Sequence, residues 1–508
     1  MRSDGRIPKR YIFDALYGAI YLPEFVWDII PTPELQRLRE IRLCNINSLG
    51  LTGGANANRY EHAIGTCYLA LECLRAWPPL NPIDEGEQRL LILAALLHDM
   101  RSAPFGHSVE YIESREGFNH EKAFDYGNRN EAEAAYEYKT ATLESIYFGM
   151  PREMSSKISE EDMAAIESII EGRGRLGPLI NSKIDLDNID NVYRLGYHIG
   201  IVRSGEVPLE LARSLWTENG ELIVKHDSLP RIEDWHNVRR RLYEFLLLNP
   251  EEFSGKCMLT DAVELAKARK TRPFSWNLVD YEFLEELRKI PPVRMPVIEH
   301  MFSNEVSLED DPSMSEVNQE VRMAFQRNRV ELSPSAQLMK EEEHEWRIVD
   351  RGKEYIVSLK DNILVASKVV VRAFEISKII SRLMKGDLYG CIAIFSTKEV
   401  DKFEILSDAE KRLELEHELG RLIRRKFDSR FKSAIVGLHT IIDVDKTERQ
   451  VCIQTDEDEV VRIGTSSHQL LIGVFFKNVD LSILGIESLP KTSITRIRAE
   501  IHDHLSDF

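Results

Sequence analysis

One short stretch constrains this chain more than any other: residues 91–107, LILAALLHDMRSAPFGH. Its apolar first half has the composition of a buried helix and is followed at once by His98 and Asp99. Because consecutive helical residues lie about 100° apart, two adjacent polar side chains at the end of such a run can reach one ion from the same turn. Pro104 and Gly106 predict that the helix stops and that a new element begins close by. A His-Asp pair alone is most often structural, so this interpretation needs support from the rest of the chain.

Length and composition fit a globular protein of several domains. The chain has 508 residues, of which 43% are hydrophobic, and its net charge is −18. This acidic charge opposes binding to a phosphate backbone, so we do not expect nucleic acid as the main partner. The six cysteines include no Cys-x-x-Cys pair, which argues against a zinc ribbon or a disulfide scaffold. No apolar stretch is long enough to span a bilayer and the first residues lack a signal-peptide core, so we expect a cytoplasmic protein without a membrane partner.

The pattern of apolar residues predicts a mainly α fold with a C-terminal α+β lobe. Residues 10–31 alternate as a short β-ribbon followed by a helix, and a Thr-Pro pair then predicts the start of a helix over Leu35–Leu43. Over residues 87–249, apolar residues recur at helical spacing with Gly or Pro at the breaks. Residues 250–340 predict further helices with looser, acidic connections.

Beyond residue 335 the apolar period changes from helical to alternating. We therefore expect a helical core over residues 1–335 and a regulatory or oligomerisation lobe over residues 336–508. A capping box at Ser407 and Glu410 predicts one helix of this lobe, and a final helix is expected over Ser493–Leu505. The predicted strands lie within residues 345–359, 391–406, 433–445, 450–463 and 468–478.

Two further candidate metal ligands lie near predicted helix ends. His62 follows a Gly/Asn-rich loop at the start of one helix, and Asp187 lies near the start of another with Asp185 and Asp190. Acidic residues there can simply favour the helix dipole, an alternative that we weigh most heavily for Asp185 and Asp190. Together with the His-Asp pair, His62 and Asp187 make two imidazoles and two carboxylates. Such a set suits a divalent ion such as Mn, Mg, Fe, Co or Zn, with open positions for water and substrate.

The order His…His-Asp…Asp is the signature of the HD superfamily, and the flanking segments narrow the resemblance. TPELQRLREIR, NRYEHAIGT, LLHDMRSAPFGHSVE and IDLDNIDNVYRLG resemble, in this order, segments of the deoxynucleoside triphosphate (dNTP) triphosphohydrolases. That family includes the bacterial dGTPases and the mammalian SAM-and-HD-domain dNTP hydrolase. The resemblance covers about residues 10–250 and implies an HD-domain helical core, which in this family often precedes a C-terminal α/β lobe.

The resemblance implies hydrolysis of a dNTP between the 5′ oxygen and the α-phosphorus, which releases a deoxynucleoside and tripolyphosphate. By matching position it implies that His107 lies at the α-phosphate, with Glu110 and His120 as a supporting acid/base pair. It also implies that Arg59 contacts phosphate and that Tyr243 stacks on the sugar. The implied metal ligands are His62, His98, Asp99 and Asp187.

Several positions depart from the family pattern. Arg101, Ser102 and Ala103 follow the His-Asp pair, where the family has Gly-His-Gly or Gly-Asn-Pro. Ser102 can donate a hydrogen bond to phosphate, as the asparagine of the bacterial dGTPases does. Asn188 stands where some members have a phosphate-binding lysine, and Leu43 replaces a glutamine that reads the sugar 3′-hydroxyl.

The resemblance also bears on effectors and assembly. Phe13 and Pro31 replace the Asn and Asp that read guanine in the activator site of the mammalian enzyme, so we do not carry that GTP site over. Arg37 and Arg39 remain, and they are the candidate contacts for a different nucleotide effector. Because effectors of this family bind between subunits, the resemblance implies a homo-oligomer.

We take a metal-dependent dNTP triphosphohydrolase as the leading hypothesis. The second hypothesis is a catalytically weak HD protein that senses nucleotides or serves as an interaction module, motivated by residues 101–103 and by the altered sugar and activator positions. The third is hydrolysis of another phosphate ester, such as a cyclic nucleotide or a modified dNTP, which Leu43 and Asn188 motivate. Metal and nucleotide binding without turnover would indicate the second, and a substrate panel separates the third from the first.

Overall fold

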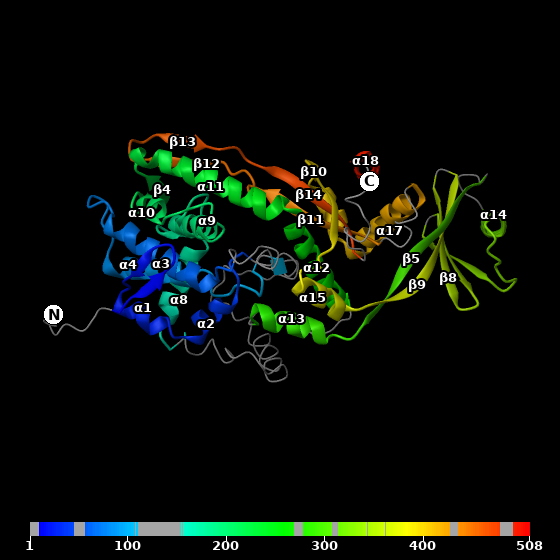
Figure 1. The fold of residues 1–508 in the computed structure, drawn as a ribbon, viewed down its shortest axis with the longest axis horizontal. Helices are drawn as coiled ribbons and strands as arrows, with labels where there is room; N and C mark the ends of the chain where they lie inside the picture. Colours follow the sequence, from blue (N-terminus) through cyan, green and yellow to red (C-terminus); the bar gives the residue numbers. More distant parts are fainter. Residues whose placement is uncertain are drawn as a thin grey trace.

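The computed structural model describes residues 10–44, 56–106, 108–109, 154, 156–268, 278–306, 313–342, 344–360, 362–426, 435–477 and 491–507. The molecule is elongated: the N-terminal helices form one end and an antiparallel sheet forms the other (Figure 1). The long helix α11 (Leu229–Leu248) runs from the first end toward the middle. A mainly α core with a sheet-containing C-terminal region is therefore confirmed.

The N-terminal part has the ribbon and helices that the sequence predicts. Its elements are β1 (Ile12–Asp14), β2 (Gly18–Ile20), α1 (Glu24–Ile29) and α2 (Pro33–Arg37), and β1 pairs antiparallel with β2. Pro33 occupies the first position of α2, as expected. The prediction of a helix to Leu43 was too long, because a 3₁₀ turn over Leu38–Glu40 ends it and Arg42 then forms a β-bridge with Asn58.

Five helices surround the His-Asp stretch. They are α3 (Arg59–Arg75), α4 (Glu85–Leu97), α8 (Glu160–Ile170), α9 (Leu186–His198) and α10 (Glu206–Ala212). α3 packs against both α4 and α9. The apolar run Leu91–Leu97 is buried throughout and forms the last turns of α4, so the helix predicted from it is confirmed. Its burial anchors the turn that follows in the main hydrophobic core.

A hairpin interrupts the region that we expected to be almost entirely helical. β3 (Leu215–Glu218) and β4 (Glu221–Val224) pair antiparallel around Asn219 and Gly220, whose φ angles are 52° and 83°. An Asn-Gly pair is a strong hairpin signal, because both central positions of such a turn need positive φ. The helical prediction for residues 87–249 was therefore wrong at this point. After α11 the chain continues in α12 (Pro250–Ala268) and α13 (Asp280–Lys289).

The far end of the molecule is a five-stranded antiparallel sheet in the order β5-β9-β8-β7-β6. Its strands are β5 (Val293–Glu305), β6 (Gln337–Glu342), β7 (Glu345–Asp350), β8 (Lys353–Lys360) and β9 (Ile363–Phe374), and α14 (Met314–Arg327) shares a hydrophobic cluster with them. The helical prediction for residues 250–340 was wrong at β5 and β6. Because β5 pairs with β9, this sheet extends across the predicted division at residue 335, which stays a prediction.

A second, three-stranded sheet lies between the two ends, in the order β10-β14-β11. Its strands are β10 (Gly390–Thr397), β11 (Val436–Val444) and β14 (His468–Phe476), and the helices of this part are α15 (Ile376–Met384), α16 (Lys402–Ser407), α17 (Ala409–Lys426) and α18 (Lys491–Asp507). The predicted cap of α17 is displaced by one residue: Ser407 ends α16, and the Asp408 carboxylate accepts the Lys411 N–H at 3.1 Å. None of the described helices is both long and apolar enough to cross a bilayer.

The last pair of strands returns to the N-terminal core. β12 (Val451–Thr455) pairs antiparallel with β13 (Val460–Ile463) and parallel with β4, giving a sheet in the order β13-β12-β4-β3. Val451, Ile453 and Ile463 are buried in the same hydrophobic cluster as α3, α4 and α9. Figure 1 shows these strands running along α11 beside the helical core. The C-terminal region therefore forms part of the core that surrounds the His-Asp stretch.

Candidate metal centre

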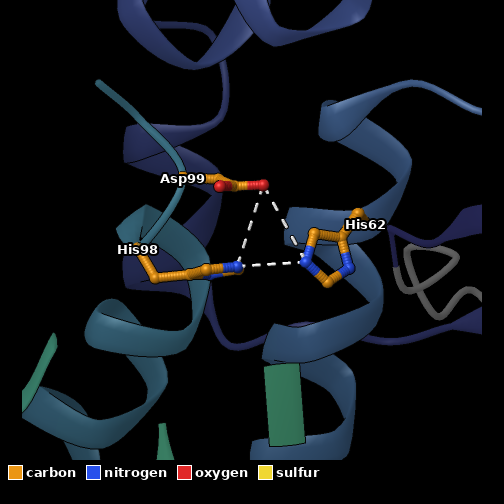
Figure 2. Close-up of side chains that lie close together, drawn as sticks. All are labelled: His62, His98 and Asp99. Carbon is orange, nitrogen blue, oxygen red and sulfur yellow. Dashed lines mark hydrogen bonds and ion pairs between the residues drawn. The ribbon is translucent and has the colours of Figure 1, made fainter. Parts of the chain in front are cut away.

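Helix ends place three of the predicted ligands together. Asn58 caps α3 through its side chain, which accepts the Glu61 N–H at 2.9 Å, and His62 follows in the first turn. His98 is the C-terminal cap of α4, and Asp99 comes next in the chain. Figure 2 shows the two imidazoles and the Asp99 carboxylate facing one another. All three residues are buried, and one donor atom from each lies within 4.8 Å of the others.

The hydrogen bonds of the two imidazoles fix which nitrogen faces the centre. His62 Nδ1 lies 2.7 Å from Asp190 Oδ2, and His98 Nδ1 lies 2.9 Å from the carbonyl oxygen of Ala95. Because carbonyl and carboxylate oxygens only accept, each Nδ1 carries a proton and, in the neutral rings, each Nε2 presents a lone pair. These two Nε2 atoms are 3.1 Å apart. That is close to the spacing of two nitrogens that each lie about 2.1 Å from a shared metal ion.

Two carboxylates complete the set of acceptors. Asp187 Oδ1 lies 2.9 Å from His62 Nε2 and 3.6 Å from His98 Nε2. Asp99 Oδ2 lies 3.9 Å from each of the same two nitrogens. It is buried and has no hydrogen-bond partner among the residues that the structure describes. An unsatisfied buried carboxylate oxygen is costly unless a cation lies beside it, so the donor set fits a divalent metal ion.

Arg59 and Ser102 hold the other oxygen of Asp99. The guanidinium of Arg59 lies 2.5 Å from Asp99 Oδ1, and the Ser102 hydroxyl donates to the same oxygen at 3.0 Å. Burial raises the pKa of the Asp99 carboxyl, but Arg59 and the two histidines outweigh it and hold that pKa far below its usual range. Asp99 is therefore ionised, with Oδ2 turned toward the imidazoles.

The charges of the centre favour a cation. Burial lowers the pKa of His62, but hydrogen bonds to Asp187 and Asp190 and their charges raise it to about 10. The carboxylates therefore favour a positive charge on His62 when no metal ion is bound. A divalent ion would compete with that proton for the same position.

A buried ion-pair chain supports His62 from behind. Asp190 Oδ2 accepts from His62 and lies 2.9 Å from Arg194 Nε, while Arg194 Nη2 lies 3.1 Å from Asp190 Oδ1. Arg194 Nη1 in turn lies 2.8 Å from Asp14 Oδ2 on β1. The carboxylates neutralise the guanidinium, and Asp190 fixes the ring orientation of His62.

We expect Asp190→Asn to weaken metal binding by about 10- to 100-fold, because the neutral amide no longer favours a proton on His62 Nδ1 and leaves Arg194 underneutralised. Titration calorimetry with Mn²⁺ measures the change. Asp234→Asn is the control, since that carboxylate accepts from Tyr193 at 3.2 Å and has no contact with the centre. Equal Mn²⁺ affinity in both variants would contradict a supporting role for Asp190.

Asp185 stabilises the start of α9, which is the structural alternative that we weighed for Asp185 and Asp190. It is the N-cap of α9: its Oδ1 accepts the Asn188 N–H and its Oδ2 accepts the Ser182 N–H, each at 2.7 Å. Burial, followed by the charge of Asp187, raises the pKa of Asp185 to about 7. This cap fixes the first turn of α9, which carries Asp187.

The turn after the His-Asp pair is held by side chains from elsewhere. Arg37 donates to the carbonyl oxygens of Ser102 at 2.7 Å and Leu278 at 3.1 Å, and burial lowers its pKa to about 9. Asp280 accepts the Phe105 N–H at 2.7 Å, where the backbone has positive φ. Arg37 is 1% exposed, so in this structure it braces the turn. A contact between Arg37 and a nucleotide effector remains a prediction.

Other predicted contacts lie around this centre. Arg39 is exposed and its guanidinium lies 4.2 Å from the Tyr60 ring centre. Tyr243 is half-buried, lies 4.4 Å from the Arg239 guanidinium, and packs against the cluster that contains Ala103 and Phe105. Their proposed contacts with effector and sugar stay predictions. His107, Glu110 and His120 lie outside the described residues.

Ser102 is completely buried, and its hydroxyl is bound to Asp99. We therefore expect Ser102→Ala to lower turnover by less than about tenfold, because one hydrogen bond contributes about 0.5–1.5 kcal/mol and Arg59 still holds Asp99. Steady-state kinetics at saturating metal would measure the effect. A loss of two orders of magnitude would instead indicate that the hydroxyl contacts the transition state.

The buried ion pairs of Asp190, Arg194 and Asp14 that support His62 were not predicted from the sequence, although one signal was present. Asp187 and Asp190 are three residues apart and Arg194 is four further on, which places them along one side of a helix. This spacing could have linked Asp190 to the metal ligands. Asp14 gives no comparable signal, because its contact with Arg194 joins residues 180 positions apart.

Comparison with known proteins assigns the fold that holds this centre. A family model for the HD domain matches residues 59–192, which include all four predicted ligands. A phosphohydrolase structure from Bacteroides thetaiotaomicron covers 92% of this chain and 100% of its own, with a TM-score of 0.52 and 15% identity. That likeness concerns the fold. Residues 59–192 therefore form an HD domain.

Its sequence relatives include uncharacterized proteins and deoxynucleoside triphosphate triphosphohydrolases. An uncharacterized protein of Bacillus subtilis, YwfO, is 24% identical over 52% of this chain and 58% of its own length. The deoxynucleoside triphosphate triphosphohydrolase SAMHD1 homolog of Dictyostelium discoideum is 24% identical over 38% of this chain and 37% of its own. SAMHD1 of Xenopus laevis is 37% identical over 19% of this chain and 16% of its own. The chain thus spans about half of the length, or less, of the curated relatives it matches.

Proposed function

We propose that this protein is a metal-dependent dNTP triphosphohydrolase that releases a deoxynucleoside and tripolyphosphate. The observation that carries the proposal is the convergence of two imidazole nitrogens and two carboxylate oxygens, one of them a buried Asp99 oxygen without a hydrogen-bond partner among the described residues. The dNTP specificity is supported by the named relatives and by the segments that resemble their family.

Each side chain has a defined task in this proposal. His62, His98, Asp99 and Asp187 would hold the ion, which when bound would supply Lewis-acid chemistry and a more acidic water. Arg59 neutralises Asp99 and keeps its second oxygen turned toward the imidazoles. The Asp187 side chain is 32% exposed, whereas those of His62 and Asp99 are 1% and 8% exposed. Substrate would therefore approach from the side of Asp187, at the start of α9.

The remaining roles are predictions from the family resemblance. His107, with Glu110 and His120 behind it, would protonate the leaving 5′ oxygen, and Tyr243 would stack on the deoxyribose. A nucleotide effector and a homo-oligomer are likewise proposed from the resemblance.

One observation favours the second candidate function, a catalytically weak nucleotide sensor. Ser102 donates to Asp99, so its hydroxyl is engaged within the centre instead of being offered to phosphate. A site that lacks one phosphate donor can still bind metal and nucleotide, and its turnover would be low.

A product assay tests the proposal. The full chain is incubated with each dNTP and NTP, singly and as mixtures, with Mn²⁺, Mg²⁺ or Co²⁺, and products are separated by ion-exchange chromatography. We expect deoxynucleoside and inorganic tripolyphosphate in equal amounts, and none after chelation. Turnover only in mixtures would identify an effector. Release of monophosphate or pyrophosphate would contradict the proposal, and metal and nucleotide binding without any product would favour the sensor.

A further inference from the structure

A turn of the C-terminal region reaches the start of α9, where Asp187 lies. This turn, residues 445–450, joins β11 to β12 and is the segment through which the chain returns to the helical core (Figure 1). Arg449 Nη1 donates to the carbonyl oxygen of Lys183 and to Asn188 Oδ1, each at 3.1 Å. Asn188 is the residue after Asp187. The contact therefore places a guanidinium at the start of α9, on the residue that follows the most exposed candidate ligand.

The turn is held rigidly in this position. Arg239, which is buried on α11, donates to the carbonyl oxygens of Asp445 and Lys446, each at 2.7 Å. The Asp443 carboxylate accepts the Thr447 N–H at 3.0 Å and the Ser467 hydroxyl at 2.8 Å. The backbone of Arg449 is also fixed, since its carbonyl oxygen lies 2.9 Å from His236 Nε2. A side chain mounted on such a turn loses little conformational entropy when it binds a ligand.

Arg449 differs from the neighbouring cations in how its charge is balanced. Arg59 pairs with Asp99, and Lys183 pairs with Asp445. Among the described residues, Arg449 forms no ion pair with a carboxylate, and its hydrogen bonds are with neutral carbonyl and amide oxygens. The Asp445 carboxylate, whose pKa Arg449 helps to lower, is paired with Lys183 instead. It is also only partly buried. A guanidinium held by neutral acceptors gains more from an incoming anion than one that already faces a carboxylate.

The charge of the centre explains why such a cation is needed. The charges of Asp99 and Asp187 offset those of a divalent ion, and Arg59 adds only one further positive charge. A triphosphate carries several negative charges, and the chain as a whole is acidic, with a net charge of −18. Extra positive charge at the start of α9 would therefore favour binding of the phosphates.

We propose that Arg449 binds phosphate oxygens of the substrate, so that the C-terminal region completes the substrate site of the HD domain. The planar fork of a guanidinium suits two phosphate oxygens at once, and exchange of a neutral amide oxygen for a phosphate oxygen strengthens the hydrogen bond. The identity of the phosphate compound rests on the proposed function, whereas the phosphate contact itself does not.

The test measures phosphate binding separately from turnover. Arg449→Gln, Arg449→Lys and the control Arg462→Gln, an exposed arginine on β13, are prepared in the full chain with Mn²⁺. Calorimetry gives the Kd of inorganic tripolyphosphate, and dNTP hydrolysis gives KM and kcat. We expect Arg449→Gln to raise that Kd and the KM about tenfold or more, Arg449→Lys to raise them less, and Arg462→Gln to change neither. The melting temperature and Mn²⁺ affinity should stay close to wild type in all three.

The outcomes separate this inference from the proposed function. Hydrolysis of dNTPs by the wild type with unchanged Kd and KM in Arg449→Gln would overturn the inference and leave the proposed function standing. The wild type could instead bind tripolyphosphate more tightly than Arg449→Gln does and yet hydrolyse no dNTP. That result would support the inference and contradict the proposed function. A large fall in melting temperature or Mn²⁺ affinity in both Arg449 variants would show a structural role and overturn the inference.

Discussion

Replacement of Asp187 by Ala is expected to lower metal-dependent turnover at least about a thousandfold while the protein stays folded. Asp187 is the proposed metal ligand with the most exposed side chain, and its described partners are the two imidazoles. Its loss would therefore remove a ligand without opening a core cavity. Its charge also raises the pKa of the buried Asp185, so its removal relieves a repulsion. Product chromatography measures the loss, and metal analysis of the purified protein measures Mn²⁺ content.

Asp227→Ala is the matched control for this variant. Asp227 is an exposed aspartate in the middle of the 3₁₀ turn His226–Ser228, and it lies outside the candidate centre. We expect wild-type turnover and metal content in the control. Full turnover with a normal metal content in Asp187→Ala would contradict the assignment of Asp187 as a ligand.

Gly65→Ala is expected to destabilise the protein and weaken metal binding, because it displaces the ion pair of Asp190 and Arg194 that supports His62. A Cβ at Gly65 would overlap Asp190 Oδ1 and Arg194 Nη2, both of which are fixed and buried. Overpacking of this kind typically costs about 1–3 kcal/mol in a core, and here the displaced group also orients His62. We therefore expect a lower melting temperature and at least about tenfold weaker Mn²⁺ binding. Differential scanning calorimetry and Mn²⁺ titration measure the two effects.

Gly255→Ala provides the comparison, because it makes the same substitution within helix α12. Nothing lies within 4 Å of a Cβ at Gly255. Alanine favours a helix over glycine by about 1 kcal/mol, so this variant should be as stable as wild type or more stable. Equal stability and equal metal affinity in the two variants would show that the linked contacts from Asp14 through Arg194 and Asp190 to His62 do not constrain the centre.

The parts of the site that were predictable from the sequence depend on local patterns. The helix over Leu91–Leu97 follows from one uninterrupted apolar run, but it ends at His98, earlier than the predicted stop at Pro104. The order of His62, the His-Asp pair and Asp187 could be read along the chain, and the structure brings these residues together at the junction of α3, α4 and α9. Their role as ligands remains a prediction that the experiments above address.

The remaining features depend on contacts between distant residues. β12 pairs with β4, so Thr455 lies opposite Val224, and no local pattern in either strand specifies that partner. Arg449 and Asn188 are 261 positions apart. Both contacts join the predicted helical core to the predicted C-terminal lobe. The change in apolar period at residue 335, on which that division rests, carries no information about contacts between the two parts. The hairpin at Asn219 and Gly220 is different, since its local signal was present and was overlooked.

The most direct test of the account is the position of a bound ion. Crystals of the full chain grown with Mn²⁺ would be measured near the manganese absorption edge, and the anomalous difference map would locate the metal. We predict one strong peak within coordination distance of four atoms: His62 Nε2, His98 Nε2, Asp99 Oδ2 and Asp187 Oδ1. Manganese bound at full occupancy elsewhere, with no peak between these four atoms, would contradict it.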